Sequence, residues 1–265
     1  MKLSIITVTY KNNADLISTL ESISSSIHID FINEIEIIVV DAAIDPNIPN
    51  IISKFDKSKI KFKLISEKDK GIYDGMNKGI HASKGKHIIF MNSGDSFNNF
   101  SLNYFLSEER FDEYVYYGNS DFYNNDDLIF HFKSNMNKKR NFLNHNCFSH
   151  QAIFYPRKLV KKLNGYRLNF TISADFDLTW RCFIEPNCNF IPLNISIAKC
   201  SLGGISCQNG LTSYKDRYAS FKSTQNYLYA SLIYIYYPVF FIKNKIVMRF
   251  EGSSILNLYR KLKSK

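Results

Sequence analysis

Residues 35–41 read IEIIVVD, a run of apolar and mostly β-branched residues that ends on an acid. Such a run is typical of a strand buried on both faces of a parallel sheet. Further strands are predicted at residues 3–9, 60–65 and 87–91, and helical periods at residues 16–23 and 72–83 lie between them. This alternation predicts an α/β fold in which helices cover a parallel sheet.

The alternation of strands and helices weakens after Asp95, although single elements can still be predicted. We predict strands at residues 114–117 and 128–132 and helices at residues 157–163 and 175–183. The composition is that of a globular chain: 45% of the 265 residues are hydrophobic, and 11 glycines and 6 prolines exclude collagen-like and low-complexity structures. The five cysteines include no Cys-x-x-Cys pair, so neither a zinc site nor a disulfide framework is expected.

The net charge of +10 is concentrated at one end of the chain. Residues 243–265 hold seven basic residues against Glu251 alone, so a nucleic-acid groove through the rest of the chain is not expected. Residues 223–242 are uncharged and rich in tyrosine, and Pro238 argues against a transmembrane helix there. The two segments suit a membrane surface, and helices packed on the domain are the alternative. The strand-like N-terminus does not resemble a signal peptide, which indicates the cytoplasm.

Most candidate residues follow the predicted strands. The carboxyl ends of parallel strands meet at one edge of a sheet, where ligands bind in such folds. We therefore expect Thr9 and Tyr10, Asp41, residues 66–71 and residues 92–95 to gather there. Asp41 could hydrogen-bond a nucleobase or a ribose, and the alternative is that it caps the turn that follows it.

The segment 67–79, EKDKGIYDGMNKG, combines charge with glycine. Gly71 begins the predicted helix, whose first amide groups favour an anion, and Lys70 and Lys78 add positive charge. Gly75 and Gly79 leave one helix face bare. Because each interior glycine costs about 1 kcal/mol relative to alanine, we expect a close approach there, to a ligand or to another helix.

Further candidates lie downstream. Asp95 follows Ser93 and Gly94, small residues that let a phosphate approach while the carboxylate holds a hard cation; a plain turn is the alternative. His150 and Gln151 could hydrogen-bond a phosphate or a sugar, although a lone histidine is more often structural.

Two acids begin the predicted helix at residues 175–183. Asp177 stands four residues before Arg181 and forms an ordinary pair with it. Asp175 shares a helix face with Cys182, which predicts that it turns inward, and an inward carboxylate is the better candidate for a base.

Together these segments resemble family 2 glycosyltransferases, on residues 4–10 (SIITVTY), 37–41 (IIVVD) and 69–79 (DKGIYDGMNKG), with Asp95 and residues 174–178 (ADFDL) in the expected order. The resemblance covers about residues 1–205. Residues 69–79 are particularly similar to a bacterial branch that builds O-antigen, capsule and colanic-acid-type polysaccharides. The family implies a GT-A (Rossmann-like) fold with a mixed, mainly parallel sheet, a nucleotide-diphospho-sugar donor and inversion at the anomeric carbon.

Carried over by position, the resemblance implies Asp175 as the catalytic base and Asp95 as the ligand of Mn²⁺ or Mg²⁺. The predicted donor-binding residues are Thr9, Tyr10, Asp41, Asp69, Lys70, Gly71, Asn77, Lys78, Ser93, Gly94, His150 and Gln151. Two motifs depart from the family pattern: the metal motif keeps the single acid Asp95, and the turn after Asp41 reads AAID.

We therefore expect a glycosyltransferase domain over residues 1–222, with a nucleotide-binding half at about 1–97 and an acceptor half at about 98–222, and a membrane-associating helical extension over residues 223–265. The predicted reaction moves a hexose from a UDP-sugar to a lipid-linked oligosaccharide in O-antigen or capsule synthesis, at the inner face of the bacterial cell membrane. A non-catalytic nucleotide-sugar-binding protein is the alternative. The sequence does not give the donor sugar, the acceptor or the oligomeric state.

Overall fold

The computed structural model describes residues 1–55, 59–124, 127–143, 147–201 and 210–235. Its strands are β1 (Leu3–Thr9), β2 (Ile35–Asp41), β3 (Lys61–Ser66), β4 (His87–Phe90), β5 (Ser96–Phe97), β6 (Val115–Asn124), β7 (Asp127–Phe132), β8 (Ile153–Pro156) and β9 (Phe190–Ser201). The helices are α1 (Asn13–Ser26), α2 (Ile48–Ser53), α3 (Ile72–Ala82), α4 (Ser101–Ser107), α5 (Arg157–Lys162), α6 (Ala174–Phe183) and α8 (Gly210–Ser223), with 3-10 turns η1 (Ile29–Glu34), η3 (Lys139–Leu143) and η4 (His150–Ala152).

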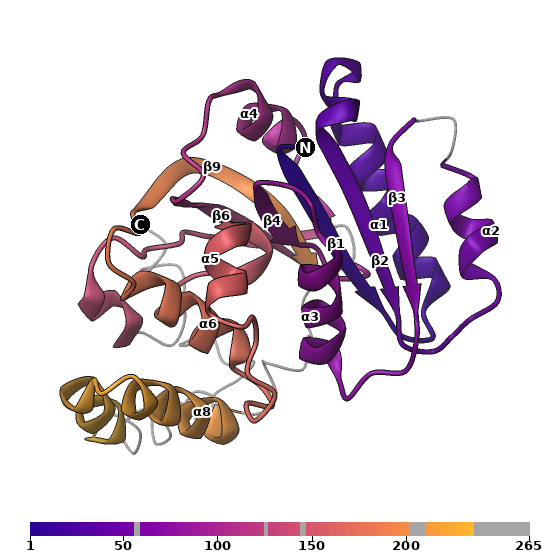
Figure 1. The fold of residues 1–265 in the computed structure, drawn as a ribbon. Coiled ribbons are helices and arrows are strands. Elements are labelled where there is room, and N and C mark those ends of the chain that lie inside the picture. Colours follow the sequence, from indigo (N-terminus) through magenta and orange to yellow (C-terminus); the bar gives the residue numbers. More distant parts are fainter. Residues whose placement is uncertain (56–58, 125–126, 144–146, 202–209, 236–265) are drawn as a thin grey trace.

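The described strands form one mixed sheet in the order β3-β2-β1-β4-β8-β6-β9-β5, and β7 pairs with β6. Figure 1 shows β3, β2, β1 and β4 side by side, with β6 and β9 beyond them. The first four strands of this order are parallel, as the alternation predicts. β8 then runs antiparallel to both β4 and β6, and so joins the parallel part of the sheet to the strands of the second half. The expected α/β fold with a mixed sheet is confirmed.

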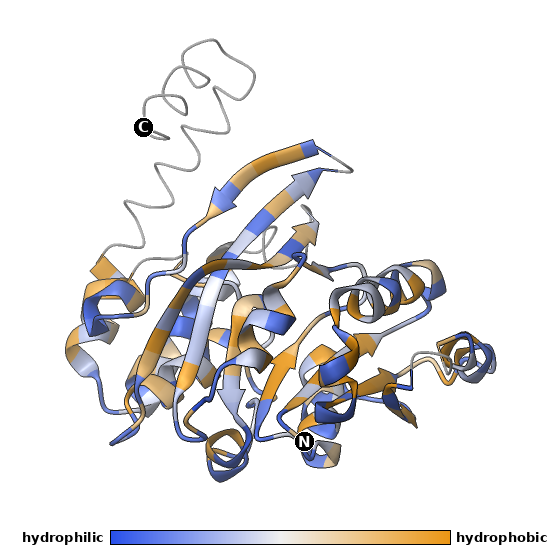
Figure 2. Cartoon of the chain, turned by 90° about the horizontal axis from the view of Figure 1, so that it is seen from above, coloured by the Kyte–Doolittle hydropathy of each residue, from blue (hydrophilic) through white to orange (hydrophobic). Residues whose placement is uncertain are grey.

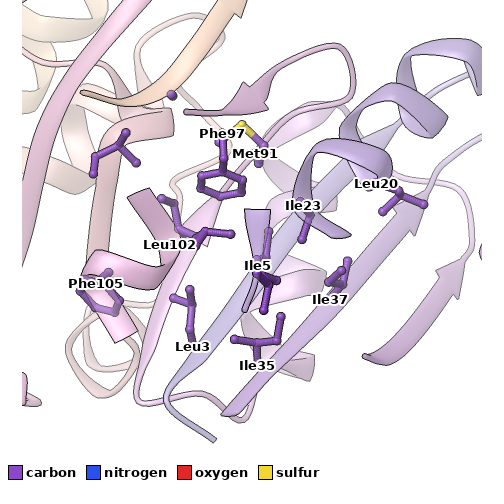
Figure 3. Packing of buried hydrophobic residues seen from close by; sticks show 14 of the residues in the cluster. Leu3, Ile5, Leu20, Ile23, Ile35, Ile37, Met91, Phe97, Leu102 and Phe105 are labelled. Carbon is purple, nitrogen blue, oxygen red and sulfur yellow. The ribbon is translucent and has the colours of Figure 1, made fainter. Parts of the chain in front are cut away.

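Two hydrophobic clusters cover the two faces of the sheet. Alternate residues of β1 enter different clusters: Leu3 and Ile5 pack under α1 and α4 (Figure 3). Ile6 packs under α3, in the second cluster. This division follows from the strand period of two, which sends successive side chains to opposite faces. Hydrophobic residues accordingly run along the central strands, and the outer helices are striped with hydrophilic ones (Figure 2).

The two glycines of α3 let the helix lie directly against β1. A Cβ atom at Gly79 would come within 2.4 Å of the Ile6 side chain, and one at Gly75 within 2.9 Å of the Asp69 carboxylate and 3.4 Å of Val8. The predicted close approach is therefore confirmed: Gly79 meets β1, and Gly75 lies against the loop that carries Asp69.

The end of the described chain packs on α6 with one side only. Residues 227–235 are helical, and Ala230 and Ile233 are buried in the cluster that contains α6. Tyr227, Leu228 and Tyr234 are exposed. In the part of the chain that the structure describes, no helix has the length and apolar character needed to cross a bilayer. Pro238 and the basic segment 243–265 lie outside the described residues.

Candidate active site

The predicted edge of the sheet forms as expected. Thr9 of β1 pairs in register with Asp41 of β2, and Asp41 with Ser66 of β3, so these parallel strands end level with one another. The N–H of Ala42 donates to the carbonyl oxygen of Thr9 at 3.3 Å, and that of Glu67 donates to Asp41 at 3.1 Å. The chain therefore leaves all three strands at the edge where ligands bind in parallel sheets.

Asp41 serves the turn that follows it. The residue is buried, and its carboxylate accepts hydrogen bonds from the N–H groups of Ala43 (2.9 Å) and Asp45 (2.7 Å) and from the Ser66 hydroxyl (3.0 Å). This is the capping role that the sequence left open as the alternative. A part for Asp41 in nucleoside binding stays a prediction that rests on the resemblance.

Beside this turn, the end of β1 presents an aromatic ring to solvent. Tyr10 is 64% exposed, and the ammonium group of Lys11 lies 5.3 Å from its ring centre. Thr9 is buried, and its hydroxyl donates to the carbonyl oxygen of Asn12 at 3.4 Å. Because an exposed ring can stack on a nucleobase, Tyr10 has the better geometry of the two for the predicted nucleoside contact.

The loop before α3 is held by nearby acids. The Asp69 carboxylate accepts from the N–H of Gly71, and the Asp74 carboxylate accepts from the N–H of Lys70, each at 3.0 Å. Gly71 has a φ of 120°, which lies in the region that glycine favours, and it precedes the first turn of α3. The Lys70 side chain is exposed beside a helix N-terminus, an arrangement that favours an anionic ligand.

Asn77 and Lys78 are engaged elsewhere in the protein. The Asn77 amide donates to the carbonyl oxygen of Tyr166 and accepts from its N–H, both at 2.8 Å. The Lys78 ammonium donates to the carbonyl oxygen of Lys68 and lies 3.2 Å from the Glu67 carboxylate. These contacts fix α3 and the loop before it, and they argue against the predicted part of Asn77 and Lys78 in donor binding.

The turn after β4 carries polar atoms that lack partners. Gly94 has a φ of 95°, and its N–H donates to the Thr19 hydroxyl at 3.0 Å. The side-chain oxygens of Asn92 and Ser93 are buried and make no hydrogen bond within the described part of the chain. Because a buried polar atom without a partner is costly, we expect water or a ligand at this turn.

Asp95 ends the same turn and is held from two sides. Its Oδ2 accepts from the side-chain amide of Gln151 at 2.8 Å, and its Oδ1 accepts from the N–H of Ser201 at 3.3 Å. Burial raises the pKa of Asp95, an effect that the Gln151 hydrogen bond opposes. An ionised carboxylate offers about four acceptor positions, so both oxygens can take further contacts.

The turn η4 links Asp95 to the other predicted acid. While Gln151 binds Asp95, the Nδ1 atom of the adjacent His150 lies 3.6 Å from Oδ2 of Asp175. The second ring nitrogen of His150, Nε2, lies 3.1 Å from the side-chain nitrogen of Asn92. Two acids far apart in the sequence are therefore connected through neighbouring residues of one turn.

Within α6, burial of the two acids is the reverse of what helix periodicity predicts. Asp177 is fully buried, and its carboxylate accepts from Arg181 Nε at 2.7 Å and from the Ser220 hydroxyl at 2.8 Å. The Asp175 side chain is 26% exposed. The pairing of Asp177 with Arg181 is confirmed, but the expectation that Asp175 turns inward is wrong, because α8 covers the other side of α6.

Two residues that the sequence did not single out hold the chain that leads to Asp175. The Tyr73 hydroxyl donates to the carbonyl oxygen of Ile172 at 2.6 Å. From α8, the Asp216 carboxylate accepts from the N–H groups of Ile172 and Ser173, each at 3.0 Å. No local sequence pattern marks either side chain, because both act on a backbone segment far along the chain.

A divalent cation fits this site when a phosphate-bearing ligand accompanies it. Among the described residues, no three His, Cys, Asp or Glu side chains gather as a metal site. Mg²⁺, however, is usually bound by one or two carboxylates together with substrate phosphates. Asp95, with the partnerless oxygens of Asn92 and Ser93 on the same turn, offers that kind of oxygen donor set.

Comparisons with known sequences agree on one family. The family model described as Glycosyl transferase family 2 matches residues 4–167. A PGL/p-HBAD biosynthesis glycosyltransferase of Mycobacterium bovis is 28% identical over 199 residues, which are 69% of this chain and 70% of the relative. The putative glycosyltransferase EpsH of Bacillus subtilis is 29% identical over 92 residues, 35% of this chain and 26% of the relative.

Solved structures share the fold. S. aureus TarS 1–349 in complex with UDP-GlcNAc has a TM-score of 0.63 at 18% identity, covering 83% of this chain and 64% of that one. The mannosyltransferase PcManGT from Pyrobaculum calidifontis, in complex with GDP-Man and Mn²⁺, has a TM-score of 0.60 at 13% identity, with 85% and 64% covered. The chain thus spans less than two thirds of these proteins, and 39% of a longer TarS chain. Likeness at such identity bears on the fold alone, and it confirms the GT-A fold.

Proposed function

Since the chain belongs to glycosyl transferase family 2, we propose that it transfers a hexose from a nucleotide-diphospho-sugar to a hydroxyl group, with inversion at the anomeric carbon. The observation that carries this proposal is the link through η4. Gln151 binds Asp95 at 2.8 Å, and His150 lies 3.6 Å from Asp175. An acid suited to the phosphate end of the donor and an acid suited to accepting a proton are thus held around one turn.

In the proposed reaction, the acceptor oxygen forms a bond to the anomeric carbon while the bond from that carbon to the donor phosphate breaks. The nucleoside diphosphate leaves from the opposite face with the bonding electrons, and the hydroxyl proton passes to the Asp175 carboxylate. Asp175 suits this step because its side chain is partly exposed, whereas Asp177 is enclosed. A positioned base of this kind contributes about 10²–10⁴-fold to the rate.

The departing diphosphate needs positive charge. The prediction left this part to Lys70 or Lys78. We assign it to Lys70, which is exposed beside the first turn of α3, because the ammonium group of Lys78 is engaged with Glu67. Mn²⁺ or Mg²⁺ held by Asp95 together with the diphosphate would neutralise charge on the leaving group. At the other end of the donor, the exposed Tyr10 ring is placed to stack on the base.

We take a UDP-sugar as the first choice of donor, and a lipid-linked oligosaccharide of bacterial O-antigen or capsule as the acceptor. The UDP-GlcNAc complex of TarS supports the first choice, and the GDP-Man complex of PcManGT makes GDP-sugars the competing class. We place the protein peripherally on the inner membrane through residues 223–265. Support comes from exposed Tyr227 and Leu228 and from a groove of about 290 Å³ between α8 and Tyr234.

The reaction is tested by nucleotide release from a panel of UDP- and GDP-sugars, with and without Mn²⁺. We expect release that Asp175→Asn lowers by about 10²–10⁴-fold and that Asp30→Asn, at an exposed acid remote from the edge of β1–β3, leaves unchanged. Full turnover by Asp175→Asn contradicts the base assignment. Tight donor binding without release by the wild type would favour a non-catalytic nucleotide-sugar-binding protein.

The membrane part is tested separately, on vesicles that contain phosphatidylglycerol. Replacing Tyr227, Leu228 and Tyr234 together by serine should release the full chain from the vesicles, because these exposed side chains supply the apolar contact. Flotation of the triple variant with the vesicles at the wild-type level would contradict this assignment and would leave the transfer reaction untouched.

A further inference from the structure

We propose that Asn92 and His150 are positioning residues that fix the orientation of the Asp175 carboxylate. They form a chain of contacts from the turn after β4, through the first residue of η4, to the first turn of α6. The proposal rests on the proposed function, since it takes Asp175 as the base. It assigns to His150 a task other than the donor contact that the sequence predicts.

Asn92 decides which nitrogen of the His150 ring carries the proton. A neutral imidazole has one N–H and one acceptor nitrogen. The Asn92 side-chain nitrogen, which can only donate, lies 3.1 Å from Nε2 of His150, so Nε2 accepts and the proton resides on Nδ1. Nδ1 is the atom that faces Oδ2 of Asp175, at 3.6 Å. The ring therefore turns an N–H towards the carboxylate.

The contacts of Asp175 show what this N–H does. Oδ1 of Asp175 accepts from the N–H of Phe176 at 2.8 Å, and Oδ2 faces His150. The hydrogen bond from Phe176 holds Oδ1, and the His150 ring, 3.6 Å from Oδ2, favours the orientation in which that oxygen lies toward η4. The remaining acceptor positions of the carboxylate can meet a hydroxyl group. The side chains of His150 and Asp175 are 19% and 26% exposed, so the pair is shielded without being sealed off.

The chain of contacts is anchored in the sheet. Asn92 follows β4, where the N–H of Ser93 donates to the carbonyl oxygen of Val8 in β1 at 3.3 Å. His150 begins η4, which runs directly into β8, and β8 pairs with β4. Asp175 lies on α6, outside the sheet. Asn92 and His150 therefore fix the position of the proposed base relative to the strands. Both ring nitrogens of His150 are directed at protein groups, and the Gln151 amide is directed at Asp95, which leaves donor binding to other residues.

The test separates turnover from donor binding. Turnover is measured as nucleotide release from the most active UDP-sugar, and binding as the Kd of UDP. We expect His150→Ala and His150→Gln to lower kcat by about 10–100-fold, the usual effect of losing a residue that orients a reactive group, with the Kd of UDP changed less than about two-fold. Asn92→Ala should lower kcat in the same direction and less strongly; because the Asn92 oxygen also belongs to the donor set beside Asp95, only kcat is compared for this variant. His28→Gln, at an exposed histidine beside Asp30, is the matched control and should change neither quantity.

A double-mutant cycle shows whether His150 acts through Asp175. In an Asp175→Asn background, His150→Ala should change the residual rate by less than about two-fold, because residues of one unit are not additive. A full independent loss in that background overturns the proposal, and so does a tenfold weaker UDP affinity at an unchanged kcat. If His150→Ala does not fold, His150→Gln takes its place in the same double-mutant cycle. Full turnover by Asp175→Asn alone marks failure of the proposed function instead, since the base itself is then absent.

Discussion

Asp175 and Asp177 lie two residues apart in α6 and have opposite surroundings. Asp177 is fully buried against Arg181 and Ser220, whereas Asp175 is partly exposed and faces His150 at 3.6 Å. The difference teaches that an acid whose oxygens are matched by fixed donors builds the fold, while an acid with acceptor positions to spare is available for chemistry. By this criterion Asp41 is a structural acid, like Asp177. The loss in the free energy of unfolding when each acid is replaced tests this division.

The largest loss of stability is expected from Asp177→Ala. The substitution leaves Arg181, which is 4% exposed, without its carboxylate partner. Removing one partner of a buried ion pair costs about 3–5 kcal/mol, to be measured by urea unfolding. Asp30→Ala, at an exposed acid, serves as the control. A loss below about 1 kcal/mol would place Asp177 with the dispensable acids and break the comparison.

Asp41→Asn should have the next largest effect. Asparagine keeps one acceptor oxygen but loses the charge that now meets the N–H groups of Ala43 and Asp45 and the Ser66 hydroxyl. We expect a loss of about 1–3 kcal/mol, the cost of leaving partly buried donors poorly matched. If stability is unchanged while the affinity for the nucleotide-sugar falls, Asp41 is a binding residue, as the resemblance implies, and not a structural acid.

A smaller effect, confined to acid pH, should come from His87, the buried histidine that begins β4. Burial lowers the pKa of His87, so its side chain stays neutral in the folded protein. In the unfolded chain the same side chain has an ordinary pKa of about 6.5 and takes up a proton below that pH. Stability must therefore fall as the pH drops below about 6.5. His87→Gln should flatten this decline between pH 7 and pH 5 in urea unfolding, and His28→Gln should not. Equal slopes in wild type and His87→Gln would rule His87 out as the source.

The smallest change of stability is expected from Asp175→Asn. Its carboxylate is partly exposed, and substitutions of that kind stay within about 0.5 kcal/mol. The same variant should show the greatest loss of turnover, so stability and activity should rank the two acids of α6 in opposite order. A large loss of stability in Asp175→Asn would show that Asp175 is also a structural acid.

The first half of the fold could be predicted from the sequence because its elements are marked locally. The run at residues 35–41 is buried at every position of β2, and α1 and α3 follow their apolar periods. β5, β8 and β9 were not predicted. β5 has two residues and β8 four, too short for a period to emerge, and β9 carries Asn194 and Lys199 within a run that is only partly buried.

The candidate site shows where local reasoning stops. Strand ends placed Thr9, Asp41 and Ser66 together, since sheet register needs no knowledge of side-chain partners. Helix periodicity gave the two acids of α6 different faces, but it could not tell which face α8 would cover. The contact between His150 and Asp175 joins η4 to the first turn of α6, and a pairing of this kind leaves no trace in either segment alone.

The hydrogen bonds of Tyr73 and Asp216 to the backbone of Ile172 have a consequence for protein engineering. Tyr73 of α3 and Asp216 of α8 grip the same peptide, so the helix that bears Asp175 is seated by a segment well past residue 167, where the match to the family model ends. A chimeric enzyme joined between α6 and α8 would take the proposed base, Asp175, from one parent and Asp216, which holds the chain before it, from the other. An exchange of this region between relatives should therefore move α6 and α8 together.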